Sequence, residues 1–442
     1  MSAQPIRVAI SGGGLAGASL LHALIDFPHL DVHIFESAAA FKEAGLAIGV
    51  TRNAQAALDL MGPWGPELLK RAGAVPMRGV RFMIAQGGGQ GEVIDEVDDI
   101  TAGKRLTSIV HRPAYLQEFL ANVPRERMHA SKKLNKIDRN TDGRGSITLY
   151  FTDGTTHECD ILIGADGIHS AVRRFILGND PAASPRNTGM WLVMTLQPYA
   201  EAQASIGKGL VDSKDAREYS WIGKNSYVMH NLLSDGQLVQ FVIASSDDEA
   251  MSSDSWHRTV RADEIKNLYQ GWPPHLMQAI DELLCKKPEH TANYLWEHPP
   301  AATYVSGPLC IMGDAAHATT PWQGSGGGMS IEDTLILSTL LGRAKSSTEA
   351  LAALKAYDQV RRPRTQRIVD SSRGTGIILT GKGEQTGLEM KKSGTLLQRW
   401  DFIIDIDMEK HRDEAIQLMD AELAGETTLG WPCNCISGSM PA

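Results

Sequence analysis

Residues 6–17 read IRVAISGGGLAG, in which six residues typical of a buried β-strand lead into a glycine-rich turn and an apolar-periodic segment. Gly12, Gly14 and Gly17 match the pattern G-x-G-x-x-G, between a predicted strand and a predicted helix. Gly12 permits a tight turn, Gly14 lets a pyrophosphate approach the backbone amides, and Gly17 lets the helix pack close to the sheet. This segment therefore predicts a dinucleotide-binding βαβ unit.

A second predicted strand, residues 31–35, leads into Glu36, which lies about 20 residues beyond the glycines. An acidic side chain at this place accepts hydrogen bonds from ribose hydroxyls, and the first turn of the helix, with Leu15 and Ala16, faces the phosphates. These residues do not distinguish NAD from FAD. A plain glycine-rich turn between a strand and a helix is the structural alternative.

Two further blocks of sequence narrow the choice between NAD and FAD. Residues 159–173 read CDILIGADGIHSAVR, and residues 313–321 read GDAAHATTP, followed by the glycine-rich QGSGGGM at 323–329. These blocks resemble the Asp-Gly and Gly-Asp motifs of the flavin-dependent aromatic hydroxylases, the single-component group A monooxygenases. Together with the first motif, the resemblance covers residues 5–375. Residues 357–366 are most similar to the salicylate-hydroxylase-like branch of that family.

The resemblance implies a role for each motif. Asp314 is expected to bind the ribityl chain of FAD, Arg112 its phosphate or ribose region, and Asp166 to link FAD binding to that of the reductant. The backbone of Ala47 and the loop 321–328 are expected to lie against the flavin ring. The cofactor residues predicted in this way are Gly12, Gly14, Leu15, Ala16, Gly17, Glu36, Ala47, Arg112, Asp166, Asp314, Pro321, Gly324, Gly326, Gly327 and Gly328.

The expected fold is α/β, with a Rossmann-like FAD-binding domain, a β-sheet substrate domain and a helical C-terminal part, as in the aromatic hydroxylase fold. The predicted FAD-binding domain comprises residues 1–180, with room for an inserted strand-rich segment at about 75–110, and residues 299–375. A mainly β substrate domain is predicted at 181–298, and C-terminal helices with a loose tail at 376–442.

Local patterns refine this outline. Residues 187–247 lose helical periodicity and show recurring strand-like runs, which predicts an antiparallel sheet. Helical periodicity returns at 332–341, and again at 348–361 and 364–371, on either side of Pro363. Gly87–Gly91 (GGGQG) is typical of a hairpin tip or flexible loop.

The predicted sheet supplies three candidates for positioning the substrate, Tyr219, Tyr227 and His230. Side chains alternate between the two faces of a strand, so only half of the sheet residues can face a pocket. His230 has the pKa range to deprotonate or orient a phenol near neutral pH, and a satisfied sheet histidine is the alternative. Trp322 is either an aromatic wall of the pocket or a packed surface residue.

Two groups of charged or polar residues are interpreted as structural. His317 lies within the Gly-Asp motif, where the resemblance implies a turn residue rather than a base. The basic cluster Arg361, Arg362, Arg364 and Arg367 is typical of a solvated helix face, with docking of NAD(P)H phosphates as the alternative.

Composition limits the partners. Lys and Arg total 43 and Asp and Glu total 52, for a net charge of −9, so we expect no nucleic acid or anionic membrane partner. No apolar run approaches the roughly 18 residues that cross a bilayer, and the N-terminus lacks the zones of a signal peptide. We therefore expect a soluble, cytoplasmic protein with small-molecule partners. A homodimer is compatible with the sequence.

The cysteines are too few and too scattered for a disulfide framework, and no four have zinc-finger spacing. Cys433 and Cys435 lie in a Gly/Ser/Pro-rich tail, where an exposed segment is a simpler interpretation than a metal or redox site. We expect no metal.

The resemblance implies an FAD-dependent, NAD(P)H-consuming monooxygenase. Such an enzyme inserts one oxygen of O2 into a phenolic or other small aromatic molecule, such as a secondary metabolite, through a hydroperoxide at flavin C4a. Epoxidation, Baeyer–Villiger insertion or oxidation without oxygen transfer are alternatives within the superfamily. The alternative from a different class is a non-catalytic dinucleotide-binding Rossmann protein.

Overall fold

A six-stranded sheet surrounds the N-terminal strand and is built from distant parts of the chain. The structure is a computed structural model that describes residues 4–42, 47–139, 146–385, 387–394 and 396–425. The strand order is β19 (Val305–Ser306), β20 (Leu309–Ile311), β12 (Ile161–Gly164), β1 (Ile6–Ser11), β2 (Leu30–Phe35) and β8 (Met128–His129). All neighbours are parallel except β19 and β20, so α1 (Leu15–Leu24) joins two parallel strands, as a dinucleotide-binding unit requires.

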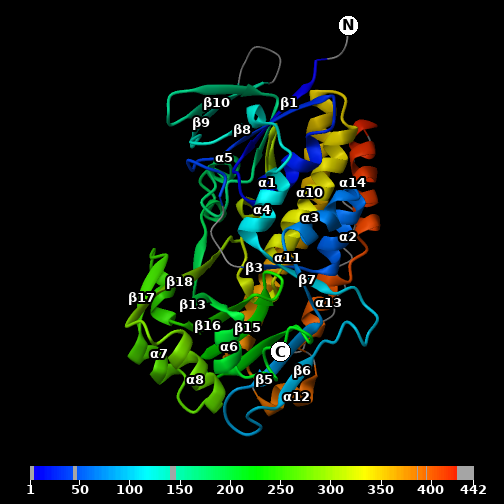
Figure 1. Cartoon of the computed structure of the whole chain (residues 1–442). Helices are drawn as coiled ribbons and strands as arrows, with labels where there is room; N and C mark the ends of the chain where they lie inside the picture. Colours follow the sequence, from blue (N-terminus) through cyan, green and yellow to red (C-terminus); the bar gives the residue numbers. More distant parts are fainter. Residues whose placement is uncertain (1–3, 43–46, 140–145, 386, 395, 426–442) are drawn as a thin grey trace.

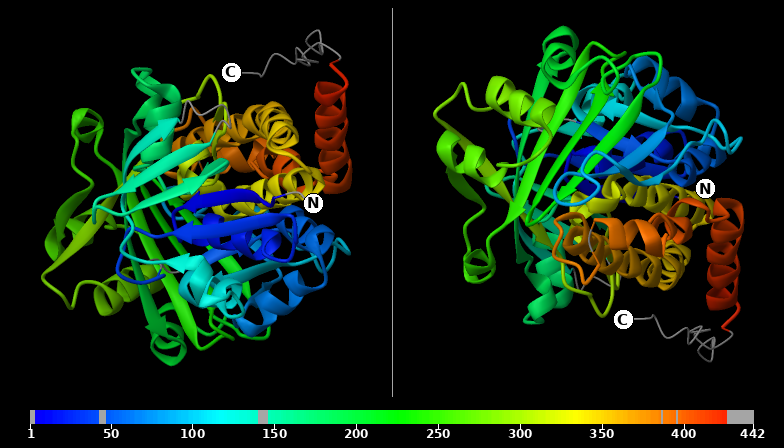
Figure 2. Two further views of the ribbon diagram at one scale, coloured as in Figure 1. Left: turned by 90° about the horizontal axis from the view of Figure 1, so that it is seen from above. Right: turned by 90° about the horizontal axis from the view of Figure 1, so that it is seen from below.

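Long helices cover this sheet (Figure 1). The central strands β1 and β12 are buried, with Val8, Ile10 and Leu162 completely inaccessible. Figure 2 shows α14 at the outer edge of the molecule, beside the yellow and orange helices. The helices of this layer are α1, α4 (Arg112–Leu120), α10 (Gly326–Arg343), α11 (Ser347–Leu379) and α14 (Met408–Leu423).

A second, eight-stranded sheet forms the other half of the molecule, in the lower part of Figure 1. Its pairs are antiparallel except for β14 and β5. The strand order is β17 (His257–Arg261), β18 (Glu289–Glu297), β13 (Arg186–Pro198), β16 (Leu238–Ser246), β15 (Ser226–Leu233), β14 (Arg217–Gly223), β5 (Gly79–Ile84) and β6 (Val93–Glu96). The strand-rich segment near residues 75–110 thus contributes two strands to this sheet.

One face of the large sheet packs against three helices, and the other faces the FAD-motif side of the molecule. Trp221, Val228 and Phe241 point toward α6 (Tyr199–Ile206), α7 (Ala262–Leu268) and α8 (Pro274–Leu283) and form one apolar core with them. Leu192, Tyr227 and Val242 point the opposite way, in a separate apolar cluster. The sheet is therefore the partition between a closed core and the side on which the motifs lie.

Smaller elements complete the framework. One three-stranded sheet has the order β3 (Ala47–Val50), β7 (Thr107–His111) and β4 (Val75–Met77), and another has the order β11 (Thr156–Cys159), β10 (Ile147–Phe151) and β9 (Leu134–Arg139). The remaining α-helices are α2 (Arg52–Met61), α3 (Trp64–Arg71), α5 (Ala171–Leu177), α9 (Asp314–His317), α12 (Leu388–Ser393) and α13 (Gln398–Ile404). Short 3-10 helices are η1 (Arg125–Arg127), η2 (Pro181–Ala183), η3 (Asp248–Ser252) and η4 (Pro321–Gln323). The glycine-rich loop 87–91 joins β5 to β6, as predicted for a hairpin.

The structure corrects two expectations about helices. The two helices predicted on either side of Pro363 are one helix, α11. A proline inside a helix costs about 3 kcal/mol, but buried ion pairs of Arg361 and Arg364 with Glu332 hold the helix on both sides of it. The stretch 187–247 also contains α6, whose Ala202 and Ile206 pack into the closed core of the sheet.

Two further observations concern the described residues alone. None of their helices combines the length and apolar character needed to cross a bilayer. They also contain no group of three or more His, Cys, Asp or Glu residues that could hold a metal ion. Cys433, Cys435 and residues 43–46, which precede Ala47 in the sequence, lie outside the described residues.

Candidate active site

A cavity of about 800 Å³ lies between the two halves of the molecule. One end is formed by Gly14, Leu15 and Ala16 of the N-terminal glycine turn. The opposite wall is the face of the eight-stranded sheet that points away from α6, α7 and α8. The three motifs identified in the sequence, which are up to 300 residues apart, thus surround one continuous space.

The glycine turn is shaped so that side chains cannot replace its glycines. Gly12 has a φ of +110°, and a Cβ added there would lie 2.2 Å from the carbonyl oxygen of Ala165. A Cβ added at Gly17 would lie 2.0 Å from the carbonyl oxygen of Gly12. Gly14 is the N-cap of α1 and provides no side-chain hydrogen bond, so the first amides of the helix remain available to an anion.

Glu36 lies at the end of β2, directly beside this turn. Its carboxylate accepts hydrogen bonds from the backbone N–H of Gly13 and of Ala38, each at 2.7 Å. These bonds fix the carboxylate at the edge of the turn, and it retains capacity to accept further hydrogen bonds.

The Gly-Asp motif lies against the glycine turn. Gly313 has a φ of +57°, and a Cβ added there would lie 2.6 Å from Cβ of Ala16. Asp314 begins α9 and is exposed to the cavity. Beyond η4, the left-handed Gly324 turns the chain into α10, which begins at Gly326.

Ten of the predicted cofactor residues line the cavity, and five do not. Gly12 and Gly17 lie beneath the turn, and Glu36 lies at its edge. Asp166 accepts hydrogen bonds from the backbone N–H groups of Ala171 and Val172 and so caps α5. Gly328 lies inside α10. The ten lining residues are Gly14, Leu15, Ala16, Ala47, Arg112, Asp314, Pro321, Gly324, Gly326 and Gly327.

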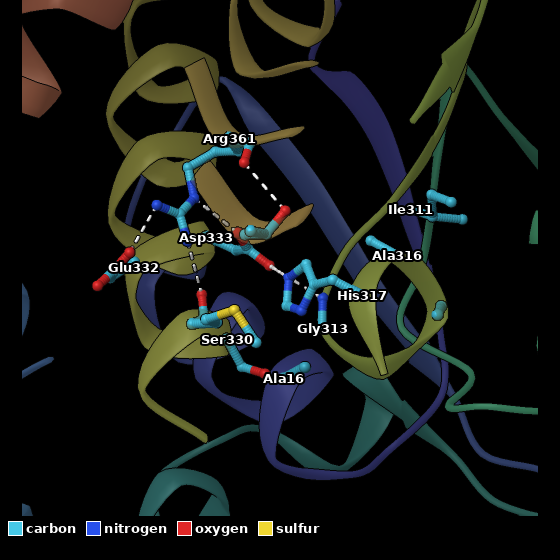
Figure 3. Close-up of polar contacts among 12 residues, drawn as sticks. Ala16, Ile311, Gly313, Ala316, His317, Ser330, Glu332, Asp333 and Arg361 are labelled. Carbon is cyan, nitrogen blue, oxygen red and sulfur yellow. Dashed lines mark hydrogen bonds and ion pairs between the residues drawn. The ribbon is translucent and has the colours of Figure 1, made fainter. Parts of the chain in front are cut away.

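A buried ion network holds the Gly-Asp motif in place (Figure 3). Asp333 on α10 accepts hydrogen bonds from the backbone N–H of Gly313 at 3.0 Å and from Nε of Arg361 at 2.8 Å. Nε2 of His317 lies 2.6 Å from the same carboxylate. Burial alone would raise the pKa of Asp333, but His317 and Arg361 together lower it below its usual range.

Glu332 extends this network toward the C-terminus. It accepts hydrogen bonds from Arg361 at 2.6 Å, from Arg364 at 2.8 Å and from the Asn53 amide at 2.6 Å. Its pKa is also held well below its usual range, because the two arginines outweigh the effect of burial. Arg361 is completely buried and Arg364 nearly so. These two residues of the basic cluster anchor α11, contrary to the prediction of a solvated helix face, whereas Arg362 is half-buried and Arg367 is exposed.

The wall formed by the eight-stranded sheet carries both apolar and polar side chains. Tyr227 lines the cavity and packs edge to face against Trp322, with ring centroids 5.4 Å apart. Trp322 is therefore a cavity wall, the first of its two predicted alternatives. Further aromatic surface comes from Phe82 on β5 and Trp400 on α13.

Contrary to the prediction, the structure does not bring Tyr219 and His230 to the cavity. Both occupy the alternate positions of β14 and β15, which point into the closed core, where their rings stack with centroids 5.2 Å apart. Burial and the nearby His275 lower the pKa of His230 to about 3. His230 is thus neutral at physiological pH and lies on the wrong face to act as a base for a substrate in this cavity.

Glu218 is a cavity residue that the sequence analysis missed. Its carboxylate accepts a hydrogen bond from Ser220 at 3.2 Å, and Oγ of Ser220 lies 2.7 Å from the Tyr227 hydroxyl. Enclosure within the protein raises the pKa of Glu218 to about 7. Strand alternation was the available signal, because Glu218 shares its face with Ser220 and not with Tyr219.

The C-terminal helices also supply cavity residues that the sequence analysis did not predict. Leu397, Trp400, Asp401 and Ile404, on and next to α13, also line the cavity, where Trp400 lies beside Phe82 of β5. They carry no motif, and their position depends on contacts between segments some 300 residues apart, as between Asp95 and the N–H of Leu397.

The raised pKa of Glu218 gives a pH-dependent stability prediction. An unfolded Glu titrates near 4.5 and the folded Glu218 near 7, so ionisation favours the unfolded state increasingly as pH rises from 4.5 to 7. Glu218→Gln should therefore raise the free energy of unfolding at pH 8 by on the order of 2 kcal/mol and change it little at pH 4. Urea unfolding at both pH values measures this effect. The exposed Glu201→Gln is the control, and a gain of equal size at both pH values would contradict the titration.

Comparison with known proteins agrees with the geometry of this site. The family model described as FAD binding domain matches residues 6–372. The chain belongs to the FAD-dependent monooxygenases. This monooxygenase is 34% identical over 423 residues to the 6-methylsalicylate 1-monooxygenase of Aspergillus terreus, covering 93% of this chain and 92% of that protein.

Two further comparisons show a similarity of the monooxygenase to salicylate hydroxylases. It is 28% identical to a salicylate hydroxylase of Sarocladium schorii, over 97% of this chain and 94% of that protein. Its fold matches that of a salicylate hydroxylase solved as a substrate complex, with a TM-score of 0.79, 24% identity and coverage of 93% and 98% of the two chains. The predicted fold class and the predicted cofactor, FAD, are confirmed.

Proposed function

We propose that this monooxygenase hydroxylates a phenolic or other small aromatic molecule, with NAD(P)H as reductant. The observation that carries the proposal is one cavity that runs from the glycine turn to an aromatic wall formed by Phe82, Tyr227, Trp322 and Trp400. Flat aromatic side chains offer the contact area that an aromatic ring requires. The relatives named for 6-methylsalicylate and salicylate support the same substrate class.

The residues present fit FAD. We assign the diphosphate to the amides at the start of α1, a ribose to Glu36 and the ribityl chain to Asp314. The flavin ring would lie between Ala47 and the start of α10, where backbone N–H groups can stabilise negative charge on the reduced ring. Arg112, which also lines the cavity, would contact the phosphate or ribose region.

The protein itself positions the reactants and excludes water. When bound, FAD accepts a hydride from NAD(P)H and activates O2 for transfer of one oxygen atom to the substrate. The large sheet and α13 enclose the substrate end of the cavity, which keeps bulk water from the reacting atoms. Residues 181–298, completed by β5 and β6, act in this proposal as the substrate domain.

The test uses the purified full-length protein. It should be yellow with bound FAD, and a phenolic substrate should accelerate NAD(P)H oxidation. Under ¹⁸O2, mass spectrometry should show one labelled oxygen atom in the product. Unlabelled product would indicate oxidation without oxygen transfer, and a product with an opened double bond or an enlarged ring system would indicate epoxidation or Baeyer–Villiger insertion.

Asp314→Ala should lose most of its bound FAD, because the variant removes the carboxylate that faces the ribityl position. The measurement is the ratio of flavin to protein absorbance after gel filtration. Asp263→Ala, an exposed carboxylate on α7, is the matched control and should retain FAD. Full FAD content in Asp314→Ala would contradict the assignment.

We also propose that the enzyme acts in the cytoplasm. In the described part of the chain, Cys159, Cys285 and Cys310 are free thiols, which suits a reducing compartment. The homodimer stays a prediction, and light scattering of the purified protein measures it.

A further inference from the structure

Three polar side chains form a row across the substrate wall of the cavity. Asn231 on β15 lies directly opposite Gln240 on β16. The pairing of Tyr219 with His230 places the preceding residue, Glu218, beside Asn231 on the other side. All three side chains line the cavity, so the wall presents a carboxylate and two amides in line.

The polar atoms of this row lack partners. Among the described residues, Oδ1 of Asn231 and Oε1 of Gln240 are buried without a hydrogen bond, and Glu218 accepts a hydrogen bond from Ser220 at 3.2 Å. Buried polar groups that stay unpaired cost free energy, so such a row is retained where a ligand satisfies it. An ionised carboxylate can only accept hydrogen bonds, so a ligand hydroxyl fits it.

The charges of the sheet wall determine which charge on a ligand it can accept. No Arg, Lys or His of the eight-stranded sheet lines the described cavity. The other acidic residue of this wall, Glu96, accepts hydrogen bonds from Arg81 at 3.0 Å and Arg217 at 2.6 Å. Glu218 has no basic partner among the described residues and is therefore the uncompensated charge of the wall.

The basic residues that line the cavity lie elsewhere. Nε of Arg52 donates to Asp405 at 2.6 Å, and Nζ of Lys104 lies 3.4 Å from the same carboxylate. Arg112 begins α4 on the FAD side. A substrate carboxylate placed against the sheet would therefore meet the charge of Glu218 with no cation beside it, and like charges a few ångströms apart repel strongly in an enclosed site.

We propose that the substrate is an uncharged phenol without a carboxylate group, whose hydroxyl donates its one hydrogen bond to Glu218 and accepts a hydrogen bond from the amide N–H group of Asn231 or Gln240. This inference rests on the proposed function and narrows its substrate class. It separates this enzyme from relatives that are named for salicylates, which carry a carboxylate next to the hydroxyl. Glu218 is, in this arrangement, the specificity-determining residue.

The test compares two ligands that differ by the carboxylate alone, 3-methylphenol and 6-methylsalicylate. Their dissociation constants are measured on the FAD-loaded, oxidised enzyme at pH 8 from the change in flavin absorbance, without NAD(P)H. We expect 3-methylphenol to bind at least about tenfold more tightly. Glu218→Gln should reduce this preference by about fivefold or more, and Glu218→Lys should reverse it.

Glu201→Gln is the matched control, because it removes a negative charge from an exposed site on α6, outside the cavity, and should leave the preference unchanged. Equal or tighter binding of 6-methylsalicylate by the wild-type enzyme overturns the inference even where the variants fail to fold. If 6-methylsalicylate is then hydroxylated, the proposed function stands without the inference. If neither ligand binds, the phenol class is wrong and both fail.

Discussion

Gly17→Ala should abolish FAD retention and lower the free energy of unfolding by at least about 3 kcal/mol. The added Cβ would lie 2.0 Å from the carbonyl oxygen of Gly12 and 3.2 Å from the Ile10 side chain. Backbone of the turn cannot yield as a flexible side chain can, so α1 would have to move away from the sheet. Flavin absorbance after gel filtration and urea unfolding measure the two effects.

Gly209→Ala provides the control for adding a methyl group. Gly209 has no atom within 4 Å of the added Cβ, and its φ is not in the left-handed region. This variant should bind FAD as the wild type does. If Gly17→Ala retained FAD with unchanged stability, the close packing of α1 against the strand would be refuted.

Arg361→Met should lower the free energy of unfolding by about 3–5 kcal/mol, because it leaves the buried carboxylates of Asp333 and Glu332 without their shared cation. FAD affinity should also fall, since Asp333 holds the backbone of Gly313. Urea unfolding and FAD titration of the apoprotein test these results separately.

Lys355→Met is the matched control on the same helix. Its side chain is 58% exposed and pairs with Glu422 at the surface, so the loss should stay within about 1 kcal/mol. A similar small loss in Arg361→Met would mean that the buried network contributes little to the stability of the fold.

Local sequence patterns were sufficient for the elements around the first motif. The strand Ile6–Ser11 has its predicted bounds, and the helix predicted after the glycine turn is α1 (Leu15–Leu24). Glycine spacing, strand periodicity and the acidic residue at the end of β2 all agree there, because nearby residues determine this unit. The family resemblance then supplied FAD and the monooxygenase activity, which local patterns left undecided.

The sequence was less informative about which face of the large sheet each side chain occupies, although that face determines whether a residue lines the cavity. Tyr219, Tyr227 and His230 are equally suitable by residue type, yet only Tyr227 faces the cavity. One residue along a strand reverses the side on which a group lies. Glu218 was missed for the same reason, although it belongs to the same alternation.

Long-range charge pairing was likewise invisible in the sequence. The run of arginines near Pro363 has the composition of a solvated helix face, and the acidic partners Glu332 and Asp333 lie some 30 residues away on α10. Only the packing of α10 on α11 shows that Arg361 is buried. The wall formed by α13 depends in the same way on contacts that no local pattern encodes.

The continuity of α11 through Pro363 has a mechanical consequence. Its 33 residues form a rod about 50 Å long, anchored at Arg361 beneath the flavin motif. Further along, Gly376 packs closely against the Trp322 indole and Leu379 reaches the cavity wall. A displacement of Gly313 would therefore be transmitted through Asp333 and Arg361 along this stiff helix to Trp322 and Leu379 in the cavity wall.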